Sequence, residues 1–428
     1  MTRHAAVDLG ATSGRVVVGS VTSESLVLQE VHRFPNGPVQ HADGLHWDVS
    51  ELYRSAVEGL TLAGELDSIG VDSWAIDYGL LADGQLLHEP FCYRDARTDD
   101  VRLDVSRREL FELCGLQHLP FTTVYQLAAE KRLADADAML LIPDLLTYWL
   151  TGSRGCELTN ASTTGLLDVR TRSWSPLAPA QLGDLVAAGS VRGEWRGVPV
   201  IAVGSHDTAS AYVGAPLSPG AAVISLGTWG LVGLELTSPV LTDEVFAANF
   251  TNELGVDGTV RFLRNVSGLW VLQECLTEWG RPNLVELLHQ AADHPTVPLI
   301  DIDDPSLLAP GNMAARVAAL GGPTDPIAVV RCLVDSLVEA LARTVEMAGS
   351  LAGQTIPGVN IVGGGSQNSL ICQGLATRLG LPVLAGPVEA TAVGNVLVQA
   401  RALGTLEGGL DDLRALVRCT QPVVRYEP

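Results

Sequence analysis

A glycine-rich turn that directly follows an acidic residue is the first stretch whose residue types could do chemistry. The apolar run Ala5-Ala6-Val7 leads to Asp8, and Gly10-Ala11-Thr12-Ser13-Gly14-Arg15 follows before Val16-Val17-Val18. This pattern predicts a β-hairpin. Its glycines allow backbone N–H groups to approach a phosphate, and a carboxylate at a strand end can hold hydrated Mg²⁺. The Gly-Lys-Ser/Thr signature of a Walker loop is absent, and an ordinary polar hairpin is the alternative.

The same pattern returns later in the chain. The stretch Ala221-Ala222-Val223-Ile224-Ser225-Leu226-Gly227-Thr228-Trp229-Gly230 again reads strand, glycine, hydroxyl residue, strand, a little over two hundred residues after the first. Two such hairpins predict two related domains, each with one phosphate loop. A third glycine-rich turn, Gly363-Gly364-Gly365, follows the apolar strand Val359-Asn360-Ile361-Val362. There a phosphate or a flat ring can lie directly on the backbone, although glycine-rich turns between strand and helix are common.

Acidic and aromatic residues stand at the ends of two further predicted strands. Val198 to Gly204 delivers Ser205-His206-Asp207-Thr208, and Ile69-Gly70-Val71-Asp72 runs into Ser73-Trp74-Ala75-Ile76-Asp77. Ends of parallel strands are where α/β proteins place ligand contacts. An indole beside carboxylates suits a sugar, because the ring covers its CH face and oxygens take its hydroxyls. A tryptophan that simply fills the core is an equal alternative for Trp74.

Composition narrows the class of protein. A chain of 428 residues with 47% apolar residues can build two or three domains, and a net charge of −22 argues against a nucleic-acid partner. Seven scattered cysteines without a Cys-x-x-Cys pair favour buried, reduced thiols. No signal peptide is visible, and prolines and glycines interrupt the uncharged stretch from Thr208 to Leu234. We therefore expect a cytoplasmic protein with no membrane partner, either a monomer or a small homo-oligomer.

Apolar periodicity predicts the helices that connect these strands. We expect a helix from Asp48 or Ser50 to about Ala63, and an apolar strand or buried segment over Met139–Leu146 that Pro143 stops. The other expected helices are Arg102–Cys114, Tyr125–Leu133, one opening at Gly268–Gln273, Ala328–Leu351 and one following Pro382–Ala385.

Taken together, several motifs resemble those of the FGGY carbohydrate kinases, and within that family the rhamnulokinase branch. They are Val7–Arg15, Ile69–Trp74, Tyr93–Thr98, Leu119–Leu127, Ser205–Ser210, Gly363–Asn368 and Gly386–Thr391. The resemblance extends from residue 5 to about residue 400. It implies an α/β fold of two actin/hexokinase-type (ribonuclease H-like) ATPase domains that flank a central cleft. Residues 1–210 would form the N-terminal domain with the sugar site, and residues 211–428 the C-terminal, nucleotide-binding domain.

The resemblance also implies a role for individual residues. Ala11, Thr12, Ser13, Gly14, Arg15 and Thr228 would hold the phosphates of ATP, and Gln273 and Gly364 would lie on the nucleotide side. Trp74, Ala75, His206, Asp207, Thr208 and Asn265 would contact the sugar, with Asp207 as the catalytic base and Asp8 organising Mg²⁺. Structural readings stay open: a satisfied core histidine for His206, a helix N-cap for Asp207, and a capping role for Asp8.

The activity that follows is ATP- and Mg²⁺-dependent phosphorylation of L-rhamnulose at O1. Trp74-Ala75 stands where the family has Trp-Gly, and the stretch between Asn160 and Asp207 is short for the family. These departures leave two alternatives open. One is a kinase for another ketose, such as L-fuculose or xylulose, and the other is a non-catalytic, actin-like protein that binds sugar or ATP.

Overall fold

The computed structural model describes residues 1–428, and they form two compact units. Unit 1 comprises Met1–Ala215, Leu236–Phe262 and Ala390–Gln421, and unit 2 comprises Pro216–Glu235, Leu263–Glu389 and Pro422–Pro428. The predicted domain boundary lies between residues 210 and 211. The chain first leaves unit 1 five residues later, and two segments of its second half return to unit 1.

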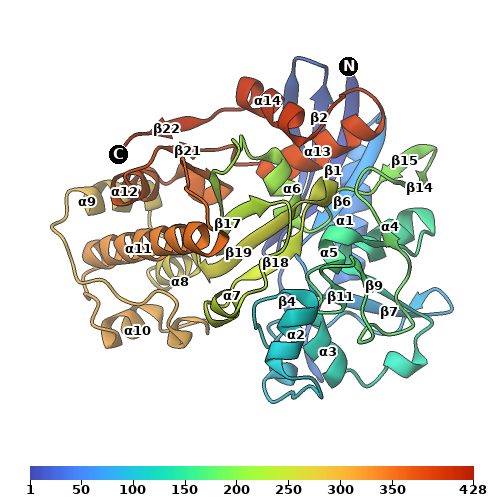
Figure 1. Cartoon of the computed structure of the whole chain (residues 1–428), viewed down its shortest axis with the longest axis horizontal. Helices are drawn as coiled ribbons and strands as arrows, with labels where there is room; N and C mark the ends of the chain where they lie inside the picture. Colours follow the sequence, from blue (N-terminus) through green and yellow to red (C-terminus); the bar gives the residue numbers. More distant parts are fainter. The chain divides into compact units, whose positions relative to one another are not determined.

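Unit 1 is built on a six-stranded sheet of order β14-β15-β6-β1-β2-β3 (Figure 1). β1 and β2 form the predicted hairpin, and β1 and β15 both lie parallel to β6. Residues 26–35 form one continuous strand, β3, which pairs with β2. The strands of this sheet are β1 (Thr2–Leu9), β2 (Ser13–Val21), β3 (Leu26–Pro35), β6 (Ser68–Ser73), β14 (Val191–Trp195) and β15 (Val198–Ile201).

Side chains of β1 alternate between the two faces of this sheet, because successive residues of a strand point in opposite directions. Ala5, Val7 and Leu9 pack in one apolar core with helices α1 (Val49–Leu62) and α4 (Ile142–Thr151). Ala6 packs in a second core with α6 (Asp207–Gly214), α13 (Ala390–Ala402) and α14 (Leu410–Thr420). Asp8 follows Ala6 by two residues, so its side chain points to the same face of the sheet, which α6 and α13 cover.

Shorter elements complete unit 1. The helix predicted over 102–114 begins later, as α2, and the helix predicted over 125–133 ends earlier, as α3. Pro143 occupies the first turn of α4 rather than ending a strand, because proline lacks only an N–H that this turn leaves unused. The remaining elements are β4 (Pro38–His41), β5 (Gly44–Trp47), β7 (Tyr78–Ala82), β8 (Gln85–Leu86), β9 (Ala138–Leu141), β10 (Cys156–Glu157), β11 (Leu167–Asp168), β12 (Ser173–Trp174), β13 (Leu185–Val186), β18 (Thr251–Leu254), α2 (Arg107–Cys114), α3 (Thr123–Ala129), α5 (Leu158–Ala161), α7 (Asp243–Ala247) and the 3₁₀ turns η1 (Ala96–Thr98), η2 (Leu133–Asp135) and η3 (Val256–Gly258).

Unit 2 repeats the strand pattern of unit 1. Its first strand, β16, pairs antiparallel with β17 and parallel with β20, just as β1 pairs with β2 and β6. The predicted long helix is α11, which begins after the N-cap Asp325 and ends before Gly353, whose backbone is left-handed. The elements that lie wholly or mainly in unit 2 are β16 (Ala222–Leu226), β17 (Trp229–Leu236), β19 (Val260–Ser267), β20 (Val359–Val362), β21 (Val383–Ala385), β22 (Val424–Tyr426), α8 (Trp270–Glu278), α9 (Leu284–Ala292), α10 (Met313–Ala319), α11 (Pro326–Ala352), α12 (Ser369–Leu379), η4 (Pro305–Leu307) and η5 (Gly364–Gln367).

Two global expectations concern cysteines and membrane segments. All seven cysteines are free, and six of them are buried, as predicted. No helix is both long enough and apolar enough to cross a membrane. The uncharged stretch after Thr208 forms α6, β16 and most of β17.

Glycines allow α6 and α13 to pack with their backbones in contact. A Cβ on Gly394 would collide with the carbonyl oxygen of Ser210, and one on Gly214 with that of Ala390. We therefore expect Gly394→Ala to lower the free energy of unfolding by about 1–3 kcal/mol, since backbone atoms must move to admit the methyl group. Urea denaturation measures this. Gly37→Ala, which would meet nothing within 4 Å, is the control and should change stability little.

Candidate active site

Three neighbouring segments of unit 1 end at the same edge of its sheet, and each carries a carboxylate. Asp8 of β1 lies directly beside Asp72 of β6 in the parallel ladder. Ser73, the last residue of β6, bridges to His206, and its N–H donates to the carbonyl of Ser205 at 2.9 Å. Asp207 follows as the first residue of α6. The topology thus gathers residues that are far apart in the chain at the carboxyl ends of parallel strands.

Asp72, which the sequence showed at a strand end but did not place among the site residues, is fully buried. Asn395 of α13 donates to its Oδ2 at 2.6 Å, while its Oδ1 has no hydrogen-bond partner. Burial raises the pKa of Asp72 well above its usual value, and the negative charges of Asp8 and Asp207 raise it further. Clustered carboxylate oxygens, one of them unsatisfied, suit a hard cation, so these residues fit Mg²⁺.

The first hairpin loop holds its shape through backbone contacts. Gly10 N–H donates to the carbonyl of Ser13 at 3.0 Å, and the Asn36 side chain donates to the carbonyl of Gly10 at 2.7 Å. At the base of the loop, Arg15 donates twice to Asp8, at 2.9 and 2.7 Å. The two residues predicted to act on phosphate and metal are therefore paired with each other. The capping role left open for Asp8 is not what its carboxylate does in this structure.

The side chain of Asp207 is accessible, and its surroundings disfavour the charged form of its carboxyl group. Its side chain keeps 32% of its surface exposed, and Thr208 Oγ1 donates to Oδ1 at 3.0 Å. Desolvation raises the pKa of Asp207, His206 opposes that shift, and the charge of Asp8 adds to it. The N-cap of α6 is His206, without a side-chain capping bond, and Asp207 lies inside the helix. The structure therefore gives no support to the capping alternative for Asp207.

A buried arginine that sequence reasoning missed fixes His206. Arg261, which has no exposed surface, donates from Nη1 to His206 Nδ1 at 2.9 Å. A guanidinium can only donate, so Nδ1 accepts and the ring proton lies on Nε2, 3.4 Å from Asp207 Oδ1. Glu253 lies 2.9 Å from the same Nη1. Burial alone would raise the pKa of Glu253, but the charge of Arg261 brings it below its usual value.

A second buried carboxylate supports the segment just before His206. Glu157 Oε2 accepts from the backbone N–H of Ser205 at 3.1 Å and from its hydroxyl at 2.9 Å. The same oxygen accepts from Thr159 Oγ1 at 2.6 Å. Burial raises the pKa of Glu157, and these hydrogen bonds oppose that shift. The polar stretch from Glu157 thus forms an internal support of the site.

Trp74 lies in the core, which favours the structural alternative for its side chain. It is 6% exposed, and its ring centroid is 4.4 Å from that of Trp47. Both indoles donate to Asp77 Oδ2, and Gln126 donates to Oδ1 at 2.7 Å. The next residue, Ala75, is partly exposed and precedes Ile76, whose φ of 69° is unusual for a branched side chain. Substrate contact by Trp74 or Ala75 stays a prediction.

Asp77 should make the stability of the protein depend on pH. Burial raises its pKa from 3.8 to about 6, although its hydrogen bonds oppose the shift. Between pH 3.8 and about 6 this carboxyl group is ionised in the unfolded chain but still protonated in the folded protein. The free energy of unfolding therefore falls as pH rises through this range and levels off above about pH 6. The loss attributable to this group is about 3 kcal/mol. Asp77→Asn should flatten that part of the stability profile, which urea denaturation from pH 4 to 7 measures. An unchanged slope in the variant would contradict the assignment.

The remaining predicted residues belong to unit 2. Thr228 lies in the loop between β16 and β17. Two carbonyl groups of this loop accept hydrogen bonds at the start of α8: Gly227 from the N–H of Leu269, and Thr228 from the N–H of Trp270. This places the start of α8, which carries the exposed Gln273, against the loop. The exposed Gly364 belongs to the turn after β20, where a Cβ on Gly365 would collide with Leu226 of β16. Asn265 lies on β19 and is partly buried.

The loop that holds Thr228, the start of α8 and the turn after β20 therefore all lie near the end of β16. None of these contacts identifies a ligand. The binding roles of Thr228, Gln273, Gly364 and Asn265 stay predictions.

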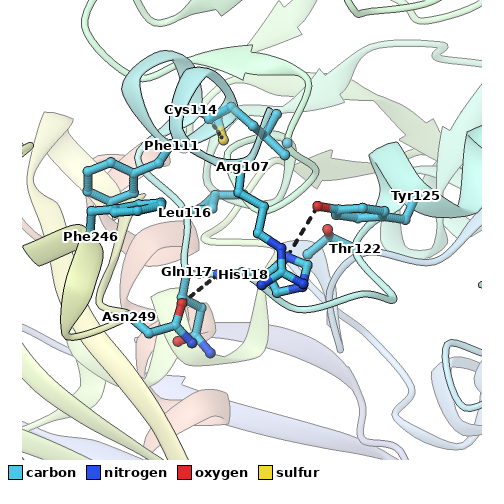
Figure 2. Close-up of a pocket in the computed structure, with 12 residues that line it drawn as sticks. Arg107, Phe111, Cys114, Leu116, Gln117, His118, Thr122, Tyr125, Phe246 and Asn249 are labelled. Carbon is cyan, nitrogen blue, oxygen red and sulfur yellow. Dashed lines mark hydrogen bonds between the residues drawn. The ribbon is translucent and has the colours of Figure 1, made fainter. Parts of the chain in front are cut away.

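A separate pocket of unit 1 contains none of the predicted site residues (Figure 2). Phe111 and Phe246 pack at its side with ring centroids 5.4 Å apart. Asn249 accepts from the backbone N–H of His118 at 2.7 Å, and Tyr125 bonds the ring of His118 at 3.2 Å. The ring pair joins α2 and α7, and the two bonds of His118 join α3 to the segment that holds Asn249. The carboxylates at the strand ends lie outside this pocket.

Comparison with known proteins identifies relatives over the whole chain. The rhamnulokinase of Bacteroides thetaiotaomicron is 37% identical over 462 aligned positions, which cover 99% of this chain and 95% of that protein. The rhamnulokinase of Pectobacterium carotovorum is 40% identical, with 99% and 92% covered.

Solved structures give the fold. A ligand-bound xylulose kinase from Lactobacillus acidophilus superposes with a TM-score of 0.81 at 16% identity, covering 100% of this chain and 94% of that one. Plasmodium falciparum glycerol kinase with ADP gives 0.78 at 16% identity, with the same coverage. The fold is the two-domain actin/hexokinase type that the sequence predicted.

Family models match both halves of the chain. The N-terminal domain model of the FGGY carbohydrate kinases matches residues 4–186, and the C-terminal domain model matches residues 222–403. The chain therefore belongs to the FGGY family of carbohydrate kinases.

Proposed function

We propose that this protein transfers the γ-phosphoryl group of ATP to O1 of L-rhamnulose, with Mg²⁺ as the metal. The substrate rests on one observation: rhamnulokinases match the chain along its whole length at 37–40% identity. The reaction type is supported by the carboxylates at adjacent strand ends beside the first hairpin. Assembly as a monomer or small homo-oligomer and a cytoplasmic location stay predictions.

Asp207 is the group that would act on the sugar. Its accessible carboxylate, with a raised pKa, is suited to orient a hydroxyl and to accept its proton as the phosphoryl group is transferred. The Nε2–H of His206, fixed by Arg261, would donate to a sugar oxygen beside that hydroxyl. Thr208 would keep the carboxylate of Asp207 in place.

Phosphate binding would fall to both units. In unit 1 the backbone of Ala11 to Gly14 and the guanidinium of Arg15 would contact the transferring end of ATP. In unit 2, Thr228 would contact phosphate, Gln273 and Gly364 the nucleotide, and Asn265 the sugar. Mg²⁺, held by Asp8 and Asp72, would neutralise charge that develops on the phosphoryl oxygens. Arg15 would then exchange its bond to Asp8 for one to phosphate.

A ketose panel with ATP and Mg²⁺ tests the proposal, with ADP release as the readout. We expect kcat/KM for L-rhamnulose to exceed that for xylulose by about 10–200-fold, since xylulose lacks a carbon that the sugar pocket would contact. Sugar-dependent ADP release that is fastest with L-fuculose or xylulose would move the substrate assignment to another ketose. Ala75, in place of the family's glycine, motivates that alternative. No release with any sugar would contradict kinase activity and favour a binding protein.

A further inference from the structure

The hairpin of β4 and β5 in unit 1 brings together two imidazoles and a carboxylate that the proposed reaction does not use. His41, Asp43 and His46 place one ligand atom each within 4.8 Å of one another. Val39 lies opposite His46, and His41 lies two residues further along β4, so both histidines face the same side of the hairpin. Their ring centroids are 4.6 Å apart. Asp43 comes from the turn between the strands.

The surroundings of His46 fix which of its nitrogens is available. Its Nδ1 lies 2.6 Å from the carbonyl oxygen of Glu89, which can only accept, so the proton is on Nδ1. Its ring is buried and packs on Phe91 with centroids 4.1 Å apart. The lone pair of Nε2 therefore points at Asp43 Oδ1, 3.0 Å away. Two acceptors at this distance need a cation between or beside them, either a proton or a metal ion.

A bond from one imidazole nitrogen to a backbone carbonyl, with the other nitrogen free to coordinate, is the arrangement of histidines that bind metals. Two imidazoles with one carboxylate suit zinc and neighbouring transition metals, and three such ligands leave one position for water. Mg²⁺ prefers oxygen ligands, so this hairpin differs in its selectivity from the carboxylates at the strand ends.

We propose that His41, Asp43 and His46 form a site for a divalent transition-metal ion such as Zn²⁺. Binding there would hold the turn against β5. The residue after His46 is Trp47, whose indole donates to Asp77 at 2.6 Å. The ion would therefore stabilise the edge of the core that contains Trp47, Trp74 and Asp77. The proposal does not depend on which sugar the enzyme phosphorylates.

Calorimetry with Zn²⁺ and visible absorption with Co²⁺ test the site on full-length protein that has been dialysed against a chelator. We expect one ion per chain, Co²⁺ bands without thiolate charge transfer, and a melting temperature that rises with Zn²⁺ concentration. His41→Gln and Asp43→Asn, at exposed positions, should each weaken binding by more than about tenfold. His289→Gln, at an exposed position on α9, is the control and should bind as the unmodified chain does.

Three results would overturn the proposal. The first is the absence of saturable Zn²⁺ binding, as expected if only a proton joins His46 and Asp43. The second is equal binding in the His41→Gln variant. The third is a Co²⁺–thiolate band, which would place the ion on a cysteine. The ketose assay in Mg²⁺ should be unchanged by His41→Gln, so loss of metal binding can be separated from loss of enzyme.

Discussion

Asp207→Asn should lower kcat by about 10²–10⁴-fold while the protein still binds sugar and nucleotide. An amide has the shape of the carboxylate but cannot take the proton of the attacking hydroxyl. Thr208 Oγ1 can still donate to the amide oxygen, so the start of α6 should keep its structure. Steady-state kinetics with L-rhamnulose measure the loss, and calorimetric titration of both ligands measures what remains of binding.

The control for this variant is an aspartate with a purely structural role. Asp325 caps α11 by accepting from the N–H groups of Ile327 and Ala328. Asp325→Asn keeps a capping oxygen, so kcat should not change and stability should change by only a few tenths of a kcal/mol. If Asp207→Asn retains normal turnover, Asp207 is not the base. If it loses turnover together with sugar binding, the result is explained by disruption of the pocket rather than by proton transfer.

The pH profile gives an independent check on the same residue. Burial and the charge of Asp8 raise the pKa of Asp207, and a base works only when deprotonated. In the unmodified enzyme, kcat should therefore rise with pH on the acid side, through the raised pKa. The residual turnover of Asp207→Asn should lack that rise. An identical acid limb in both proteins would assign the titration to another group.

Local patterns in the sequence were sufficient to predict both hairpins, the long helix α11 and the strand ends that carry Asp8 and Asp207. Each depends on residues close together in the chain: an apolar run, a turn glycine, or an N-cap such as Asp325. The repeated hairpin pattern also predicted that the two units share a topology. Strand pairing such as that of Asp8 with Asp72 follows from the parallel order of β1 and β6 once the fold is known.

The residues that support the site could not be predicted because their partners are distant in sequence. Arg261 and His206 are 55 positions apart, and Asn395 and Asp72 are 323 apart. Arg261 stands in an apolar strand pattern that carries no sign of a buried charge. Its role becomes visible only when β18 and β19 bring Glu253 and the arginine beside the start of α6.

A local pattern also misled at one proline. Proline after the apolar run of β9 was taken as a stop, whereas at Pro143 it starts a helix. For Trp74 the sequence left sugar contact and core packing as equal alternatives, and no contact in the structure excludes the first of them. The burial of Trp74 against Trp47 depends on packing between distant segments, which a strand pattern does not reveal.

Arg261→Met should lower the free energy of unfolding by about 3–5 kcal/mol, the cost of breaking a buried ion pair by removing one partner. The carboxylate of Glu253 would lose its counter-ion, and the carbonyl oxygens of Leu254 and Thr159 would lose their guanidinium donors. Urea denaturation measures this loss. The matched control is Arg401→Met, which removes an arginine–aspartate pair at the surface of the same unit, with Asp257, and should cost no more than about 1 kcal/mol.

A double variant separates the effect of Arg261 on stability from its effect on the reaction. In Arg261→Met with Glu253→Gln, the uncompensated charge is gone, so part of the lost stability should return. His206 still lacks the donor that fixes its proton on Nε2, so kcat should stay low, because the hydrogen bonds that orient Asp207 and the sugar are no longer defined. Recovery of kcat together with stability would show that Arg261 only holds the fold. Recovery of stability alone would establish it as a positioning residue, acting on the transfer through His206.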